Sequence, residues 1–291
     1  MTTINWYPGH MKKTKDLIAQ HLKLVDVCVE LLDARIPYSS RNPQFDQLVQ
    51  NKPRVVVLNK ADLADQKVLN EWIAYYKDQG IEAIPMDSMK GAGVPKLLTA
   101  VQNAAKEKLD RWTSKGMAPR AIRLMIIGIP NVGKSSLINK LVGKKSAKTG
   151  NKPGVTKGKQ WVRIRKDIEL FDTPGILWPK IEQDEVGMHL AFTGAIKDEI
   201  MHLDDLAFHL IKELVEAYPV MMKDRYELED HYEETIEIMD HIARTRGCIK
   251  KGNQLDYEKV ARLVLDEYRK GVIGRICLER PSDALVLGKD V

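Results

Sequence analysis

The residues best suited to chemistry form a glycine-rich loop at Gly128–Ser135, GIPNVGKS. The loop matches G-x-x-x-x-G-K-[ST] and lies between an apolar run, AIRLMII, and a helix-like run, SLINKL. This context suits a phosphate-binding loop, because the glycines let backbone N–H groups surround phosphate oxygens where a strand meets a helix. Lys134 is expected to reach the β- and γ-phosphates. The predicted nucleotide contacts in the loop are Pro130, Asn131, Val132, Gly133, Lys134, Ser135 and Ser136.

A Mg²⁺ and γ-phosphate site is predicted beside this loop. The Ser135 hydroxyl would ligate Mg²⁺, and Asp172 of DTPG, about 40 residues later, would hold the ion through water. Thr156 in PGVTKG would bring a second hydroxyl to the ion, and the Gly175 N–H would sense the γ-phosphate. The segment around Thr156 would then order with GTP and loosen with GDP. The alternative is that Thr156 is an ordinary loop residue.

Guanine selectivity is predicted at Asn59–Asp62, NKAD, which follows a short β-branched run. The Asp62 carboxylate can accept hydrogen bonds from guanine N1–H and from the exocyclic amine, and adenine offers neither donor pattern. Asn59 is expected to brace neighbouring loops, and the Lys60 stem to lie along the base. A backbone N–H after the next strand would face guanine O6, in the segment Ser88, Met89 and Lys90.

These motifs need a strand-and-helix framework to position them. Apolar runs and helical spacing predict strands at Val25–Leu32, Arg54–Leu58, Ile81–Pro85 and Ala121–Ile127, helices at 65–79 and 93–109, and a hairpin over 158–172. Strands alternating with helices indicate an α/β fold with a mostly parallel sheet covered on both faces. Three later segments space their apolar residues at three and four. We therefore expect a nucleotide-binding domain at 1–184 and a small all-helical domain at 185–291.

The order of the motifs is permuted. GTPases usually run from the phosphate loop through the switch threonine and D-x-x-G to N-K-x-D, whereas NKAD and SMK come first here. The same sheet can form if the usual ends are joined through residues 106–120 and new ends open after DTPG. The sequence thus predicts a circularly permuted P-loop GTPase domain.

Composition limits the class of protein. Residues 106–184 carry 18 Lys/Arg against 7 Asp/Glu, whereas residues 185–291 carry 15 against 22. This basic middle third favours a polyanionic partner, most often nucleic acid, although a solvated basic surface would show the same excess. The three cysteines (Cys28, Cys248 and Cys277) are widely spaced and indicate neither a disulfide framework nor a metal site. No apolar run approaches a membrane span, and the first residues lack the core of a signal peptide.

The whole chain resembles the bacterial circularly permuted GTPases of the ribosome biogenesis GTPase A group. The resemblance rests on WYPGHM (6–11), DARIPYSSRNP (33–43), NKAD, GIPNVGKSS, PGVT and DTPGI, and more weakly on the helical tail. It implies GTP hydrolysis coupled to late assembly of the large ribosomal subunit, binding to ribosomal RNA, and a cytoplasmic location. We expect a monomer off the ribosome, with GTP or GDP and Mg²⁺ as ligands.

Hydrolysis needs a group that orients the attacking water. The residue after DTPG is Ile176, which cannot hydrogen-bond water, so unstimulated turnover should be about 10⁻³ s⁻¹ or slower. His10 of PGHM is the candidate, since imidazole can accept a proton near neutral pH and the resemblance implies such a role; alternatively it only packs. Asn131 could help to hold K⁺ between the phosphates, or it could simply favour the turn. The expected catalytic set is His10, Lys134, Thr156 and Gly175.

The tail is net acidic, so only one edge of it should meet RNA. Its basic residues gather at Arg244, Arg246, Lys250 and Lys251, with Arg262, Arg269, Lys270 and Arg275 further on. This edge would act together with the basic surface over Lys144–Lys166. Rival interpretations are an ATP-using P-loop kinase, which NKAD argues against, an RNA-binding module with vestigial hydrolysis, and a GTPase acting on tRNA or membranes.

Overall fold

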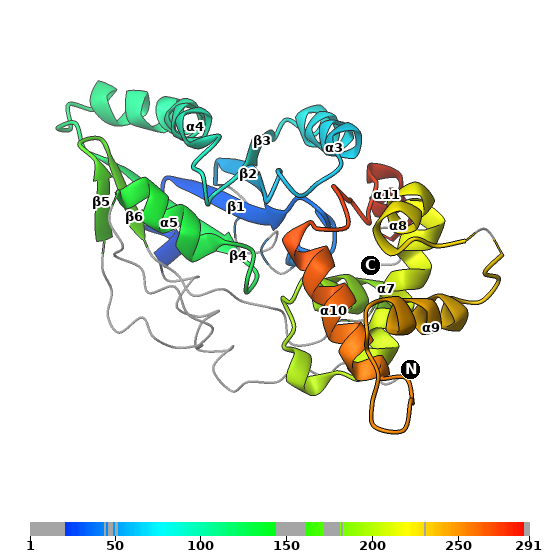
Figure 1. Ribbon diagram of the computed structural model, residues 1–291. Helices are drawn as coiled ribbons and strands as arrows, with labels where there is room; N and C mark the ends of the chain where they lie inside the picture. The colour runs from blue at the N-terminus through cyan, green and yellow to red at the C-terminus, as the bar shows by residue number, and fades with distance from the viewer. Residues whose placement is uncertain are drawn as a thin grey trace.

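Figure 1 shows the computed structural model of the chain, which describes residues 21–43, 45, 49, 52–143, 161–171, 181, 183–229 and 231–287. A six-stranded sheet forms its centre. The strands are β1 (Val27–Asp33), β2 (Arg54–Asn59), β3 (Glu82–Met86), β4 (Ile122–Gly128), β5 (Trp161–Arg165) and β6 (Ile168–Phe171). Their order is β3-β2-β1-β4-β6-β5, and only the β5–β6 pair is antiparallel.

The chain order explains how a permuted sequence builds this sheet. From β1 the chain moves outward to β2 and β3, and then returns through α4 (Val94–Ser114) to place β4 on the other side of β1. The hairpin of β5 and β6 completes the far edge beyond β4. Residues 106–120, expected to join the usual chain ends, are helical as far as Ser114. The mostly parallel sheet and the permuted order are those predicted from the sequence.

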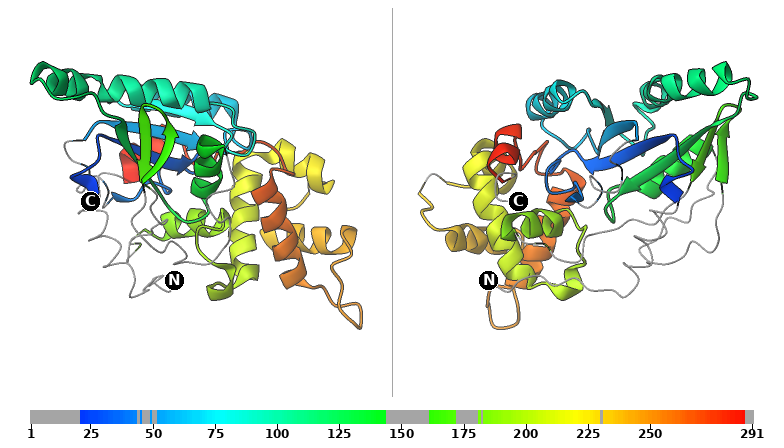
Figure 2. Two further views of the ribbon diagram at one scale, coloured as in Figure 1. Left: turned by 90° about the vertical axis from the view of Figure 1, so that its left-hand side faces the viewer. Right: turned by 180° about the vertical axis from the view of Figure 1, so that it is seen from behind.

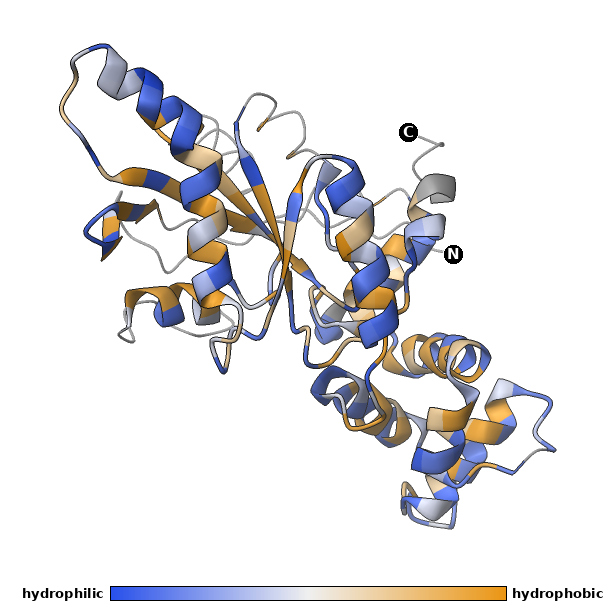
Figure 3. Cartoon of the chain, turned by 90° about the horizontal axis from the view of Figure 1, so that it is seen from above, coloured by the Kyte–Doolittle hydropathy of each residue, from blue (hydrophilic) through white to orange (hydrophobic). Residues whose placement is uncertain are grey.

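Helices cover both faces of the sheet. On one face, alternate β1 residues such as Val29 and Leu31 pack in a core that also contains α4 and α5 (Lys134–Val142). On the other face, Leu32 and its neighbours pack with α3 (Gln66–Asp78), where Trp72 is buried. Alternation along a strand sends successive side chains to opposite faces, so each strand supplies both cores. Figure 3 shows apolar residues concentrated along the strands and hydrophilic ones on the outer surfaces of α3 and α4.

The region after residue 183 is helical and lies beside the sheet (Figures 1 and 2). The predicted helical segments appear as α7 (Leu203–Ala217), α9 (Thr235–Thr245) and α10 (Tyr257–Lys270). The sequence interpretation did not single out α6 (Asp184–Phe192), η1 (Asp198–Ile200), α8 (Pro219–Tyr226) or α11 (Pro281–Leu287). The α7 and α10 helices pack together through Leu210, Leu214, Val260 and Val264, all fully buried. No helix in the described part of the chain is long and apolar enough to cross a membrane.

The last described segment returns to the sheet. Backbone N–H groups of Ile276 and Leu278 donate to the carbonyls of Leu63 and Arg35. The Trp72 indole donates to the Glu279 carbonyl over 2.9 Å, and Cys277 is buried in the α3-side core. The chain therefore leaves the sheet, forms the helical region, and returns at residues 276–278 to contact the loops that follow β1 and β2.

Candidate nucleotide-binding site

Five parallel strands, β1, β2, β3, β4 and β6, end at the same edge of the sheet, and the guanine motifs and the phosphate loop follow three of them. NKAD begins at the last residue of β2, SMK follows β3, and the phosphate loop follows β4. Ligands of open α/β sheets bind outside the carboxyl ends of the strands, where the strand order reverses. Here that reversal lies between β1 and β4. The fold thus brings the motifs that begin at residues 59, 88 and 128 to the same edge of the sheet.

The phosphate loop has the backbone that its sequence demands. Asn131 and Gly133 have φ values of 58° and 100°, in the left-handed region, and α5 begins at Lys134. A Cβ on Gly133 would lie 2.2 Å from Asn59 Nδ2, so only glycine fits. The N-terminal N–H groups of a helix attract anions, and α5 begins directly after this loop. Lys134 is nearly buried, at 9% exposure, and Ser135 lies in the first turn of α5.

Asn59 joins the phosphate loop to the guanine loops. Its Nδ2 donates to the Val132 carbonyl over 2.7 Å. Its Oδ1 accepts from the Ser88 N–H over 3.1 Å and from the Ser88 hydroxyl over 2.6 Å. The side chain is buried, at 2% exposure, so these bonds do not compete with water. One amide therefore fixes the relative positions of three loops.

The guanine loop, which carries NKAD, is fixed by contacts with the ends of β3 and β1. Ala61 N–H donates to the Met86 carbonyl over 3.0 Å, which draws the loop against the end of β3. Lys60 has a φ of 59°, and its ammonium donates to Asp33 Oδ2 over 2.8 Å. Asp62 is half-buried, and among the described residues its carboxylate has no hydrogen-bond partner. Both of its oxygens can therefore accept the donors of a guanine edge.

The segment expected to face guanine O6 shows a different hydrogen-bond pattern. The N–H groups of Met89 and Lys90 donate to Asp87 Oδ1 over 2.9 and 3.0 Å, and that of Ser88 donates to Asn59. All three donors are thus already engaged, and a base oxygen would have to share one with Asp87. The reason is the residue before SMK, since an Asp side chain readily accepts from backbone N–H groups two and three residues on.

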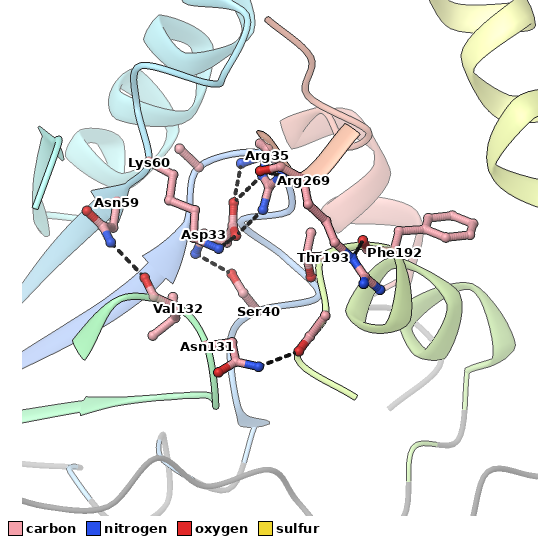
Figure 4. Close-up of polar contacts among 12 residues, drawn as sticks. Asp33, Arg35, Ser40, Asn59, Lys60, Asn131, Val132, Phe192, Thr193 and Arg269 are labelled. Atoms are coloured by element: carbon pink, nitrogen blue, oxygen red, sulfur yellow. Dashed lines mark hydrogen bonds and ion pairs between the residues drawn. The ribbon is translucent and has the colours of Figure 1, made fainter. Parts of the chain in front are cut away.

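Asn131 has an unforeseen partner. Its Nδ2 donates to the carbonyl of Gly194, in the turn after α6, over 2.7 Å (Figure 4). The phosphate loop therefore touches the helical region directly. Several predicted positions lie outside the described residues: His10, Thr156, Asp172, Gly175, Ile176 and the part of the basic surface from Lys144 to 160.

The sequence interpretation missed Asp33 and Arg35 as parts of this site. Asp33 ends β1 and is buried at 1% exposure, and its carboxylate binds both Lys60 and Arg35. Burial alone would raise the pKa of Asp33, but the Arg35 and Lys60 cations outweigh it and hold that pKa well below its ordinary value. From the sequence, Asp33 and Arg35 were named only as part of the family resemblance, within the motif DARIPYSSRNP. Its position directly after a buried strand was the available signal.

Only some residues of the predicted RNA edge are exposed at the surface. Arg244 and Lys250 are exposed, at 71% and 55%, and Lys251 is exposed beside them in the α9–α10 connection. Arg246 instead donates to the Arg225 carbonyl and lies over the Tyr226 ring. Arg269, also grouped with this edge, binds Asp198 and the carbonyls of α6. In the folded protein, these two arginines thus make internal contacts.

Comparison with known proteins now identifies the family. A family model described as 50S ribosome-binding GTPase matches residues 123–245, beginning in β4 just before the phosphate loop. Ribosome biogenesis GTPase A of Bacillus cereus is 49% identical over 280 residues, which is 96% of this chain and 95% of that protein. Its counterpart in Priestia megaterium is 49% identical over 283 residues, 97% of this chain and 98% of that protein. This chain belongs to the ribosome biogenesis GTPase A family.

Solved structures agree with this assignment. A GDP-bound YlqF structure matches with a TM-score of 0.70 and 28% identity, covering 93% of this chain and 100% of that one. A GNP-bound YlqF from T. maritima matches with a TM-score of 0.65 and 29% identity, covering 92% and 98% of the two chains. As a member of the family the chain binds guanine nucleotide and hydrolyses GTP, on a circularly permuted fold.

Proposed function

We propose that this GTPase binds the large ribosomal subunit or its precursor and couples GTP hydrolysis to a late step of subunit assembly. The observation that carries the proposal is 49% identity over nearly the whole chain to proteins named ribosome biogenesis GTPase A. The basic excess of residues 106–184 supports a polyanionic partner. The alternative is a GTP-regulated RNA-binding module that acts on another RNA. We place the protein in the cytoplasm, as a monomer when it is off the ribosome.

We assign the nucleotide to the edge where the strands end. Asp62 would accept from guanine, the Lys60 stem would lie along the base, and the phosphate loop would surround the phosphates. Asn59 supports this arrangement, because its hydrogen bonds hold Val132 and Ser88 in place before a ligand arrives. Pre-organised donors bind better because less ordering remains to be done on binding.

We assign Mg²⁺ to Ser135, Thr156 and Asp172. The position of Ser135 in the first turn of α5, directly after the left-handed Gly133, fits a hydroxyl ligand beside the phosphates. When bound, the ion would neutralise charge that builds on the phosphate oxygens. The Gly175 N–H would report the γ-phosphate. The helical region 185–291 would then respond to the nucleotide, since it follows DTPG by few residues.

The water-positioning role is assigned to His10. Ile176 cannot perform it, and an imidazole can accept a hydrogen bond from water. We expect His10→Ala to retain GTP binding and to lose ribosome-stimulated turnover. Undiminished stimulated turnover in that variant would exclude the role.

A K⁺ role is assigned to Asn131. Its Nδ2 is engaged with Gly194, so the amide oxygen is the atom that would meet a cation. K⁺ between the phosphates would supply positive charge to the transition state. Faster turnover in K⁺ than in Na⁺ at equal ionic strength is the expected result, and equal turnover in the two salts would exclude it.

Co-sedimentation with large ribosomal subunits tests the proposed function. The protein would be mixed with purified subunits in a non-hydrolysable GTP analogue, in GDP, and without nucleotide. We expect strong pelleting only with the analogue, since hydrolysis would then be the release step. Equal pelleting in all three conditions would remove the coupling to hydrolysis. No pelleting in any condition would favour the alternative RNA partner.

A further inference from the structure

Asp33 is a buried carboxylate that the nucleotide assignment above does not use. Its Oδ2 accepts from Lys60 Nζ over 2.8 Å and from Arg35 Nη2 over 2.9 Å. Its Oδ1 accepts from Arg35 Nε over 3.0 Å and from the Arg35 N–H over 3.1 Å. The Asp33 N–H is also engaged, with the Ser40 hydroxyl. The carboxylate therefore stands fixed between the guanine loop and Arg35 (Figure 4).

Arg35 continues from this carboxylate to the helical region. Its Nη1 lies 3.4 Å from the carbonyls of both Tyr268 and Arg269, in the last turn of α10. Its guanidinium lies 5.0 Å from the centre of the Tyr268 ring. A cation at the C-terminus of a helix is stabilised by the partial negative charge of the final carbonyls. Arg35 thus holds the end of α10 against the loop that carries Asp33.

The same junction reaches the phosphate loop by a second route. Arg269 binds Asp198 through both terminal nitrogens and donates to the carbonyls of Ala191 and Phe192. These carbonyls end α6, and the turn that follows presents the Gly194 carbonyl to Asn131. The guanine loop and the phosphate loop are therefore both in polar contact with one small part of the helical region.

We infer that Asp33 is a positioning residue for nucleotide binding, which holds Lys60 for the base, and that Arg35 ties this arrangement to the end of α10. The inference rests on the proposed placement of guanine at residues 59–62. Neither residue touches the nucleotide in this arrangement. Asp33 acts through Lys60, and Arg35 acts through Asp33.

The physical reason lies in the length and burial of the lysine. A free Lys side chain has many rotamers, and fixing it against a base costs conformational entropy that an anchored ammonium has already lost. Lys60 is largely buried, which by itself lowers the pKa of its ammonium, and Asp33 is the anion that opposes this effect. Without the carboxylate, Lys60 and Arg35 would be two close cations that repel each other.

Asp26 provides a matched control at the other end of the same strand. It precedes β1, is fully buried, and also binds one Lys and one Arg, Lys108 and Arg120. Asp26→Asn and Asp33→Asn therefore remove similar buried ion pairs. Only Asp33 lies at the nucleotide edge. Comparing the two variants separates loss of stability from loss of positioning.

A double-mutant cycle on the full chain tests the inference. The Kd for fluorescent GDP would be measured for Lys60→Met, Asp33→Asn, the double variant and Asp26→Asn, at a temperature where circular dichroism shows each folded. We expect Asp33→Asn to raise Kd about tenfold, and less than twofold when Lys60 is already Met. KM for GTP should rise by a similar factor with kcat unchanged, because the base contact is the same in ground and transition states. Asp26→Asn should lower the melting temperature and leave Kd within twofold.

Each outcome bears on a different statement. An Asp33→Asn Kd no higher than that of Asp26→Asn, or a tenfold effect that persists in the Lys60→Met background, overturns the positioning role. An unchanged Kd in Lys60→Met alone overturns the placement of guanine at 59–62 and the inference with it. If Asp33→Asn does not fold, Arg35→Lys replaces it, since lysine retains one ion pair with Asp33 but lacks the nitrogens that reach α10. An intermediate rise in Kd then supports the tie to α10, and an unchanged Kd excludes it.

Discussion

In the proposed site, Asp62 would select guanine by presenting two acceptor oxygens to two donors of the base. The Asp62 carboxylate is half-buried and has no partner among the described residues, while Lys60 beside it is drawn to Asp33. An acceptor-only group distinguishes guanine from adenine, because the wrong base leaves polar groups without partners in a partly dry site. The neighbouring ion pair thus leaves the Asp62 oxygens available for the base.

Asp62→Asn should exchange the preferred base. The amide keeps one acceptor but opposes the exocyclic amine of guanine with its own N–H donors, so affinity for GDP should fall about a hundredfold. Xanthine carries a carbonyl where guanine carries that amine, so XDP should bind the variant better than GDP does. Competition of XDP, GDP and ADP against a fluorescent nucleotide measures this. Wild-type GDP affinity in the variant would place the base elsewhere.

Gly133→Ala should damage the site through Asn59. The new Cβ would stand 2.2 Å from Asn59 Nδ2 and would break its bond to Val132. We expect a loss of about 2 kcal/mol in nucleotide binding, or roughly thirtyfold in Kd, from that bond and from the left-handed backbone. Gly143→Ala is the control, because Gly143 ends the same helix at a φ of 69° with no atom within 4 Å. That control should lower stability and spare affinity.

At the scale of elements, a buried histidine joins three parts of the chain. His189 on α6 binds Glu213 of α7 through Nε2 at 3.0 Å and Glu279 of the returning C-terminal segment through Nδ1 at 2.8 Å. Glu279 in turn accepts the N–H groups of Tyr38 and Ser39, after β1. Burial alone would lower the pKa of His189, but the two carboxylates outweigh it and raise that pKa to about 10. The histidine is therefore charged at neutral pH and holds the helical region to the sheet.

His189→Gln should lower the free energy of unfolding by about 3 kcal/mol at pH 7, as expected for breaking a buried ion pair. The folded pKa lies above the unfolded value of 6.5, so this stabilisation is complete below pH 6.5 and is lost as pH rises toward 10. Urea unfolding at pH 6.5, 8 and 9.5 would show the two proteins converging as pH rises. The exposed His202→Gln serves as the control. A constant difference across this range would show that His189 contributes packing rather than charge.

At the scale of the molecule, the nucleotide-binding edge and the predicted RNA-binding residues lie on different elements. The nucleotide edge faces the junction with the helical region, and the α9–α10 connection carries the exposed Lys250 and Lys251. Lys250 pairs with Asp256, as Arg262 pairs with Glu258 and Lys270 with Asp266, and each of these basic side chains remains more than half exposed. Lys250 and Lys251 are adjacent, exposed members of the predicted RNA edge, and they are therefore the residues to test.

Lys250→Glu combined with Lys251→Glu should weaken binding to large-subunit RNA and make its salt dependence shallower. Each lost phosphate contact lowers the slope of log K against log salt by about one, so the pair should change it by about two. The control is Lys67→Glu with Lys77→Glu, two exposed lysines on α3. Filter binding across a salt series measures both. Equal slopes in the two double variants would remove the α9–α10 connection from the RNA surface.

The sequence by itself determined the local features of this protein. Gly128–Ser135 predicted a loop between strand and helix, and NKAD predicted a turn after a strand, because phosphate loops and strand ends depend on backbone geometry encoded within a few residues. The predicted strands and helices lie within a few residues of observed ones, except that α4 runs five residues further, to Ser114, whereas α6, η1, α8 and α11 were not predicted. The alternation of strands and helices likewise sufficed to predict a mostly parallel sheet, and the order of the motifs sufficed to predict its circular permutation.

Only the tertiary structure decided which side chains meet across the chain. Asp33 and Lys60 are brought together by the pairing of β1 and β2, and Arg35 meets Tyr268 only because α10 packs beside the sheet. Asp87 had no marked role in the sequence, yet it occupies the N–H groups expected to face guanine. Arg246 and Arg269, both grouped with the predicted RNA edge, make internal contacts that the sequence did not predict. Local propensity cannot encode such pairs, because their free energy depends on burial and geometry that exist only once distant segments have packed.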